Sequence, residues 1–323
     1  MFFVRISDQE VRWIDSYQGE SYWKKTMTHD LPYWKKSITI VDARPRTPVQ
    51  CIRQVTTHYN IPMLKSNIQK TFRRNVLSSC LSTVKQLLRQ DPMEALRRLP
   101  VIFLEDGLLH HESFSLVVWL LAAYAKGYRL RTEDEMLILS AVTTACSATH
   151  RYSLYKETEE KKETDDQEIG PSGYSFALLS VFGGMKDDIT FLLKLASRVD
   201  ELEVLPSWLP TPHVNDFTMD HMIPESIDFH CCGTMIEWCK ERTRMNHNAI
   251  QQAIWWHWSS INVRTITEDQ SRVLYEESQR LQSKGNAMRL YTLVQMYSTI
   301  KIKWMNHNKK KVMVQSTLSF PLL

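Results

Sequence analysis

The chain has 323 residues, of which 43% are hydrophobic, so it can fill the core of one large domain or of two ordinary ones. Its formal net charge of +4 permits contact with nucleic acid without requiring it. The six cysteines have no regular spacing, which argues against a disulfide-stabilised secreted protein. The first residues lack a secretory signal pattern, and the longest apolar run, 116–125, is about half as long as a membrane span. We therefore expect a soluble intracellular protein without membrane contact, nuclear in a eukaryote and otherwise cytoplasmic.

Residues 1–50 combine short periodic pieces with aromatic residues, and we assign them to an N-terminal aromatic and basic arm. Asp8–Val11 is typical of the start of a short helix, and Ile38–Val41 is the best strand candidate, expected at an edge. Tyr22–Lys25 and Tyr33–Lys36 both read Tyr-Trp-Lys-Lys. Such residues can stack on bases while the lysines meet phosphates, or the aromatic rings can anchor the arm on the core while the lysines stay solvated.

The stretch 64–112 predicts a helical hairpin inside a domain spanning 51–155. Apolar residues recur at helical spacing on both sides of Asp91-Pro92, where the proline ends one helix and fits the first turn of the next. The apolar positions of the first helix are Leu77, Cys80, Leu81, Val84, Leu87 and Leu88.

The order of short motifs in this stretch carries a family resemblance. IQKTFRR, an amphipathic helix ending in QLL, and then QDP, LRRL and LEDGL resemble the helical, collar-like region that follows the ATPase core in MgsA-type AAA+ proteins, which include the Werner-helicase-interacting proteins. The resemblance implies a replication or repair setting and allows a homo-oligomer, because this region belongs to the oligomer-forming part of those proteins. None of the nine glycines lies in a Gly-x-x-x-x-Gly-Lys-Ser/Thr run, which binds nucleotide phosphates. The resemblance therefore implies a chain that keeps the helical platform of this family without the ATPase.

Basic residues near both ends of the hairpin form the best candidate nucleic-acid contact. If the two helices pack antiparallel, these side chains could share one exposed side and contact phosphates without reading bases. Alternatively they form a solvated face that pairs with Glu94, Glu105 or Asp106. The candidate residues are Lys70, Arg73, Arg74, Arg97 and Arg98.

The remaining elements also predict helices. Residues 113–126 are apolar nearly all round, which places that helix in a core. Thr132 and Glu135 indicate a capping box for the next helix. The charged residues 156–173 predict a flexible linker or surface loop, followed by a second helical region, 174–306. With almost no convincing strand pairs, the expected fold class is all-α, an irregular multi-helix array around the collar-like hairpin.

The stretch 211–239 is rich in histidine, aspartate and cysteine, and His221, Asp228 and His230 are its candidate metal ligands. No pair of residues has a recognised metal-ligand spacing, and the alternative is a loop whose polar residues cap helices. We therefore expect no metal and no cofactor. A metal-dependent enzyme remains the alternative.

The last stretch, 307–323, combines three consecutive lysines with a peptide that resembles those docking on DNA sliding clamps. In such peptides a glutamine amide enters a polar pocket, and apolar residues from three positions onward fill a hydrophobic cleft. The matching residues are Gln315, Leu318, Phe320 and Leu322, with Phe320 favouring the bacterial form. The alternative is a frayed tail whose apolar end packs on the protein.

Together these features predict a non-enzymatic helical adaptor in DNA replication or repair, with a sliding clamp as its partner and replication proteins or DNA as further contacts. No nucleophile, base and orienting group are indicated as a set. A nucleic-acid-binding module is the other alternative.

Overall fold

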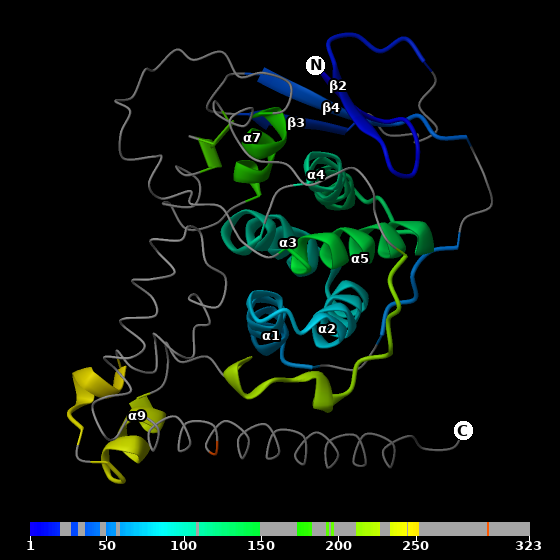
Figure 1. The fold of residues 1–323 in the computed structure, drawn as a ribbon. Helices are drawn as coiled ribbons and strands as arrows, with labels where there is room; N and C mark the ends of the chain where they lie inside the picture. The colour runs from blue at the N-terminus through cyan, green and yellow to red at the C-terminus, as the bar shows by residue number, and fades with distance from the viewer. Residues whose placement is uncertain are drawn as a thin grey trace, which may run out of the picture. The chain divides into compact units, whose positions relative to one another are not determined.

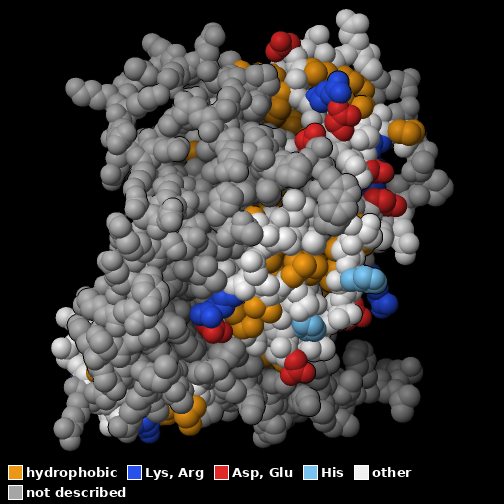
Figure 2. All heavy atoms as spheres, in the orientation of Figure 1, with side chains coloured by type: hydrophobic (Ala, Val, Ile, Leu, Met, Phe, Trp, Pro, Cys, Tyr) orange, Lys and Arg blue, Asp and Glu red, His pale blue; other side chains and the backbone are white. Residues whose placement is uncertain are grey.

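The computed structural model describes most of the first half of the chain and shorter parts of the second, which are the coloured parts of Figure 1 and the residues not drawn in grey in Figure 2. The described residues are 1–19, 27–31, 36–45, 50–55, 59–107, 110–148, 173–182, 192–193, 195–196, 211–226, 233–243, 245–251 and 296. The chain divides into two compact units. The first unit comprises Met1–His58 and Val84–Val214, and the second comprises Tyr59–Thr83 and Asn215–Leu323.

The N-terminal segment of the first unit forms a four-stranded mixed sheet, three of whose strands are labelled in Figure 1. The strand order is β2-β1-β4-β3. Its central strands, β1 (Phe2–Arg5) and β4 (Lys36–Asp42), are parallel, with Phe3 opposite Ile40. The outer strands, β2 (Val11–Ile14) and β3 (Met27–Leu31), pair antiparallel with β1 and β4. The expectation of an all-α fold is therefore wrong, because the sheet joins the helices in an α/β arrangement.

The sheet is hard to predict from the sequence, because three of its strands have only four or five residues and carry charged or polar side chains. The helix expected from Asp8 is instead a turn that leads into β2, closed by a 2.9 Å bond from the Ile6 amide to the Glu10 carbonyl. The strand expected at Ile38–Val41 is confirmed within β4, but it lies inside the sheet and not at an edge.

Helix α4 (His111–Ala125) lies between the sheet and two further helices, α3 (Pro92–Asp106) and α5 (Thr132–Cys146) (Figure 1). It contacts β1, β2 and β4 on one side and α3, α5 and α7 (Gly173–Val181) elsewhere. This position explains its sequence, since a helix covered on all sides needs an apolar surface all round. The predicted core helix is thus confirmed, and Trp119 at its centre is fully buried.

The predicted break between the hairpin helices is also confirmed. Helix α2 (Leu77–Gln90) ends before Asp91, whose side chain accepts a 3.1 Å hydrogen bond from the amide of Glu94 and so caps α3.

None of the described helices is long and apolar enough to cross a membrane.

The second unit is built around α1 (Ile61–Arg73) and the first part of α2, with two short 3-10 turns, Met219–His221 and Pro224–Ser226, and helix α9 (Gly233–Lys240). Asn67 on α1 holds the two turns through its amide. Its Nδ2 donates to the Thr83 hydroxyl at 2.7 Å and to the His221 carbonyl at 3.0 Å. Its Oδ1 accepts from the Ile223 amide at 3.0 Å and from the Ser226 hydroxyl at 2.5 Å.

Candidate functional site: a buried charge cluster

A cluster of charged side chains lies at one edge of the sheet in the first unit. Arg5 is the last residue of β1 and Asp42 the last of β4, and the parallel register sets them side by side. Arg44 follows Asp42 by two residues. The carboxyl ends of parallel strands are where α/β proteins often bind ligands, so this edge is the first place to look for chemistry.

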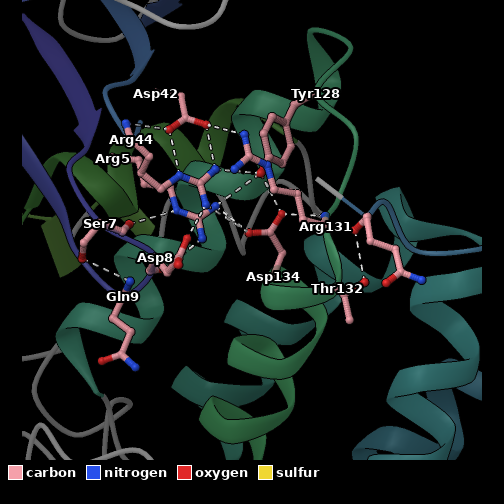
Figure 3. Close-up of polar contacts among 11 residues, drawn as sticks. Arg5, Ser7, Asp8, Gln9, Asp42, Arg44, Tyr128, Arg131, Thr132 and Asp134 are labelled. Atoms are coloured by element: carbon pink, nitrogen blue, oxygen red, sulfur yellow. Dashed lines mark hydrogen bonds and ion pairs between the residues drawn. The ribbon is translucent and has the colours of Figure 1, made fainter. Parts of the chain in front are cut away.

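The centre of the cluster is Asp134, near the start of α5. Its Oδ1 lies 2.6 Å from the Nη1 of Arg5, and neither side chain is exposed. Its Oδ2 accepts a 2.7 Å hydrogen bond from the hydroxyl of Tyr128. Arg5 also donates to the carbonyls of Ser7, at 3.3 Å, and Asp8, at 2.9 Å, which holds the turn between β1 and β2 against the cluster (Figure 3).

Arg44 forms the second half of the cluster. Its guanidinium donates two hydrogen bonds to the carboxylate of Asp42, at 2.8 and 2.7 Å, and one to Asp8 at 2.7 Å. It also donates to the Tyr128 hydroxyl at 2.9 Å (Figure 3). Arg131 completes the set, with its Nη2 3.5 Å from the Asp42 carboxylate. Three arginines thus face three aspartates, and the cluster is balanced in charge.

The electrostatics fix Asp42, Tyr128 and Arg44 in one protonation state each near neutral pH. Burial alone would raise the pKa of Asp42, but the hydrogen bonds and charge of Arg44 outweigh it and lower that pKa. Burial and the neighbouring Asp134 raise the pKa of Tyr128, so its hydroxyl stays protonated. The pKa of Arg44 is raised by its carboxylate partners in spite of burial, so the guanidinium stays charged. Such groups hold structure together and are poorly suited to moving protons.

The cluster also shapes the start of α5. The Oδ2 of Asp134 accepts a 2.8 Å hydrogen bond from the amide of Arg131, so the capping contact lies one residue before the predicted capping box of Thr132 and Glu135. Glu135 instead receives two 2.8 Å hydrogen bonds from the guanidinium of Arg89 on α2. The prediction failed because Asp134 is held by Arg5, a residue 129 positions away.

The predicted basic patch is divided between the two units. In the second unit the ammonium of Lys70 is buried and donates to the Glu225 carbonyl at 3.0 Å, while Arg74 lies 3.4 Å from the Glu225 carboxylate. Arg73 is half-buried beside it on α1. In the first unit Arg97 lies 3.5 Å from Glu94, and Arg98 is half-buried on α3. Lys70 and Arg74 therefore hold the segment around Glu225.

The candidate metal ligands are described only in part. His221 lies in a 3-10 turn, and its Nδ1 accepts a 2.9 Å hydrogen bond from the Thr218 amide. Among the residues that the structure describes, no three histidine, cysteine or carboxylate side chains converge on a metal position. Asp228 and His230 lie outside the described residues.

The clamp-binding residues Gln315, Leu318, Phe320 and Leu322 lie outside the described residues, as do nearly all of the Tyr-Trp-Lys-Lys repeats and residues 156–172 of the predicted linker. The buried charge cluster, in contrast, was missed by the sequence analysis. The only local signal was a charged residue directly after each apolar strand stretch, Arg5 after FFV and Asp42 after ITIV.

Comparison of the chain with models of known protein families, with curated proteins and with solved structures finds no match.

Proposed function

We propose that the protein is a non-enzymatic adaptor in DNA replication or repair that docks on a DNA sliding clamp through the peptide Gln315–Leu322. The observation that carries this proposal is the spacing of Gln315, Leu318 and Phe320 behind three consecutive lysines. A glutamine and a few apolar residues at this spacing supply the small buried anchors from which short docking peptides draw most of their affinity. The proposed function places the protein inside the cell, in the nucleus of a eukaryote.

The buried charge cluster supports a structural role for the first unit. Its arginine, aspartate and tyrosine side chains are hydrogen-bonded to one another, and Tyr128 and Asp42 keep their ordinary charge states at neutral pH. A unit held rigid in this way suits a scaffold that presents surfaces to partners. IQKTFRR and LRRL resemble motifs of the clamp-loader relatives, and this resemblance supports the same replication setting. In that setting the hairpin would contact other proteins or a second copy of the chain in a homo-oligomer.

The test is the affinity of the full chain for purified clamps, measured by calorimetry with a bacterial and a eukaryotic clamp in separate titrations. The double variant Q315A/L318A should lose about tenfold or more in affinity, because both anchors leave their pockets. The matched control, S316A/T317A, changes the two residues between the anchors and should bind as the unchanged chain does. Absence of saturable binding to either clamp, or equal affinity of the two double variants, would refute the proposal.

A further inference from the structure

Two exposed arginines of the first unit, Arg53 and Arg129, adjoin the same backbone bridge although they are far apart in sequence. An isolated antiparallel bridge pairs Cys51 with Arg131, and the amide of Ile52 donates a 3.0 Å hydrogen bond to the carbonyl of Leu130. Arg53 directly follows Ile52, and Arg129 directly precedes Leu130. Arg53 and Arg129 are thus the residues that directly adjoin the bonded pair Ile52 and Leu130.

The side chains of these two arginines point to solvent. Leu130 is buried and Ile52 is half-buried, and neighbouring residues on extended backbone point to opposite sides. Arg53 and Arg129 are both exposed, and neither forms an ion pair with any residue that the structure describes. Two like charges close together repel each other, so this placement is not one that stabilises the fold by itself.

The backbone that carries this pair is held rigidly. On the Arg129 side, Arg131 donates its amide to Asp134 at 2.8 Å and its guanidinium lies 3.5 Å from Asp42, both in the buried charge cluster. On the other side, the Thr132 amide donates to the Gln50 carbonyl at 2.9 Å. The buried charge cluster therefore fixes the position of an exposed basic strip, which we define as residues 50–54 and 129–132.

The chemistry of the strip fits phosphate groups. A guanidinium presents a planar fork of donors that matches two phosphate oxygens, and it stays charged at every physiological pH. The other exposed side chains of the strip include Gln50, Gln54 and Thr132, which are uncharged and polar. Such groups commonly contact phosphates and sugars.

An acidic protein surface fits the strip less well. Protein interfaces usually have an apolar or aromatic side chain as an anchor at their centre. Among the described residues of the strip, Cys51 is the only exposed side chain that is not polar or charged. Glu133 is an exposed acidic residue next to the strip. It lies in the first turn of α5, where the helix N-terminus favours a carboxylate, so its place is explained by the helix.

We propose that Arg53 and Arg129 bind the phosphate backbone of a nucleic acid, without reading its bases. This assigns the nucleic-acid contact to the strip and not to the predicted patch of Lys70, Arg73, Arg74, Arg97 and Arg98. The proposal goes beyond clamp docking and does not depend on it.

The experiment uses the full chain without a clamp and measures fluorescence anisotropy of a labelled short DNA duplex and of one of its single strands over a range of salt concentrations. The variant R53Q/R129Q should bind about tenfold or more weakly near physiological salt, with the slope of log affinity against log salt reduced by roughly 1 to 2. The variant R53K/R129K keeps both charges but loses the forks, so its slope should be unchanged and its affinity a few-fold lower.

The matched control is R12Q, which removes an exposed arginine from β2 that pairs with Glu10. It should bind DNA as the unchanged chain does, and circular dichroism should show equal folding of all variants. The proposal is overturned if the unchanged chain does not bind DNA at low salt, or if R53Q/R129Q binds as R12Q does. It is also overturned if polyglutamate binds as tightly as DNA and loses that affinity in R53Q/R129Q, because the strip would then serve an acidic protein.

Discussion

Arg5 and Asp134 meet at 2.6 Å with neither side chain exposed, although 129 positions separate them in the sequence. Their contact joins the end of β1 to the start of α5. Neither charge could stay buried without the other, since an ion removed from water without a partner is strongly unfavourable. The pair therefore makes the sheet and the helices of the first unit depend on each other.

Replacing Asp134 by Asn should reduce the free energy of unfolding by about 3–5 kcal/mol, because the Arg5 charge remains buried without a counter-charge. Urea denaturation followed by circular dichroism measures this loss. The control is R12Q, which removes an exposed ion pair worth less than about 1 kcal/mol. Equal stability of the two variants would show that the Arg5–Asp134 pair does not hold the unit together.

Replacing Tyr128 by Phe should cost about 1–3 kcal/mol, because Arg44 and Asp134 each lose a buried hydrogen bond. The pKa of Tyr128 is raised in the folded state, so its contribution is complete below the ordinary tyrosine pKa of 10.0 and is lost as pH rises above it. Denaturation curves at rising alkaline pH should therefore converge for Y128F and the unchanged chain. A constant difference between them would contradict the hydroxyl's place in the cluster.

His29 on β3 should make the first unit less stable in weak acid. Burial, with a smaller contribution from Lys126, lowers the pKa of His29 although the Ala122 carbonyl and Asp30 act in the opposite direction. Its Nε2 lies 3.1 Å from the Ala122 carbonyl oxygen, so this nitrogen donates when the ring is neutral. A lowered pKa means that the contribution is present above the ordinary value of 6.5 and is lost as pH falls below it.

The variant H29Q keeps a donor for Ala122 but does not titrate. Its thermal midpoint should fall less than that of the unchanged chain between about pH 7 and about pH 5. Below that range both proteins should lose stability together, because the lowered pKa of Asp42 gives a contribution that disappears at lower pH. Parallel curves over the whole range would mean that His29 is not the titrating group.

The sequence allowed the helices to be predicted where their signals are local. The apolar surface of α4 follows from its neighbours along the chain, and the Asp91-Pro92 break needs only the geometry of proline. The sheet could not be predicted in this way, because β1 pairs in parallel with a strand more than thirty residues later. No periodicity within either strand records that pairing.

The candidate site was missed for the same reason. Each member of the buried charge cluster has an ordinary sequence context, and only the fold shows that Arg5, Arg44 and Asp134 share one place. Lys70 of the predicted basic patch shows the same difficulty, since a lysine is usually exposed but this one is buried and donates to the Glu225 carbonyl. Charge in a sequence does not tell whether a side chain faces solvent or a partner within the protein.

Asn67 should control how firmly the segment around Ile223 is held in the second unit. Replacement by Ala removes the acceptor of the Ile223 amide and of the Ser226 hydroxyl, and the donor to Thr83, so about 2 kcal/mol or more should be lost. Hydrogen exchange at the Ile223 amide should become faster. The control N60A removes a cap contact at the start of α1 and should leave that amide protected. Equal protection in N67A would contradict the role of the Asn67 amide.

The claim that the protein docks on a sliding clamp through Gln315–Leu322 is tested most directly by competition. A synthetic peptide of residues 315–323 is titrated into a complex of the full chain with the clamp, and the fraction of chain that remains bound is measured. We predict complete displacement by the peptide, and no displacement by the same peptide with Gln315 and Leu318 replaced by Ala. A chain that stays on the clamp at saturating peptide would contradict the claim.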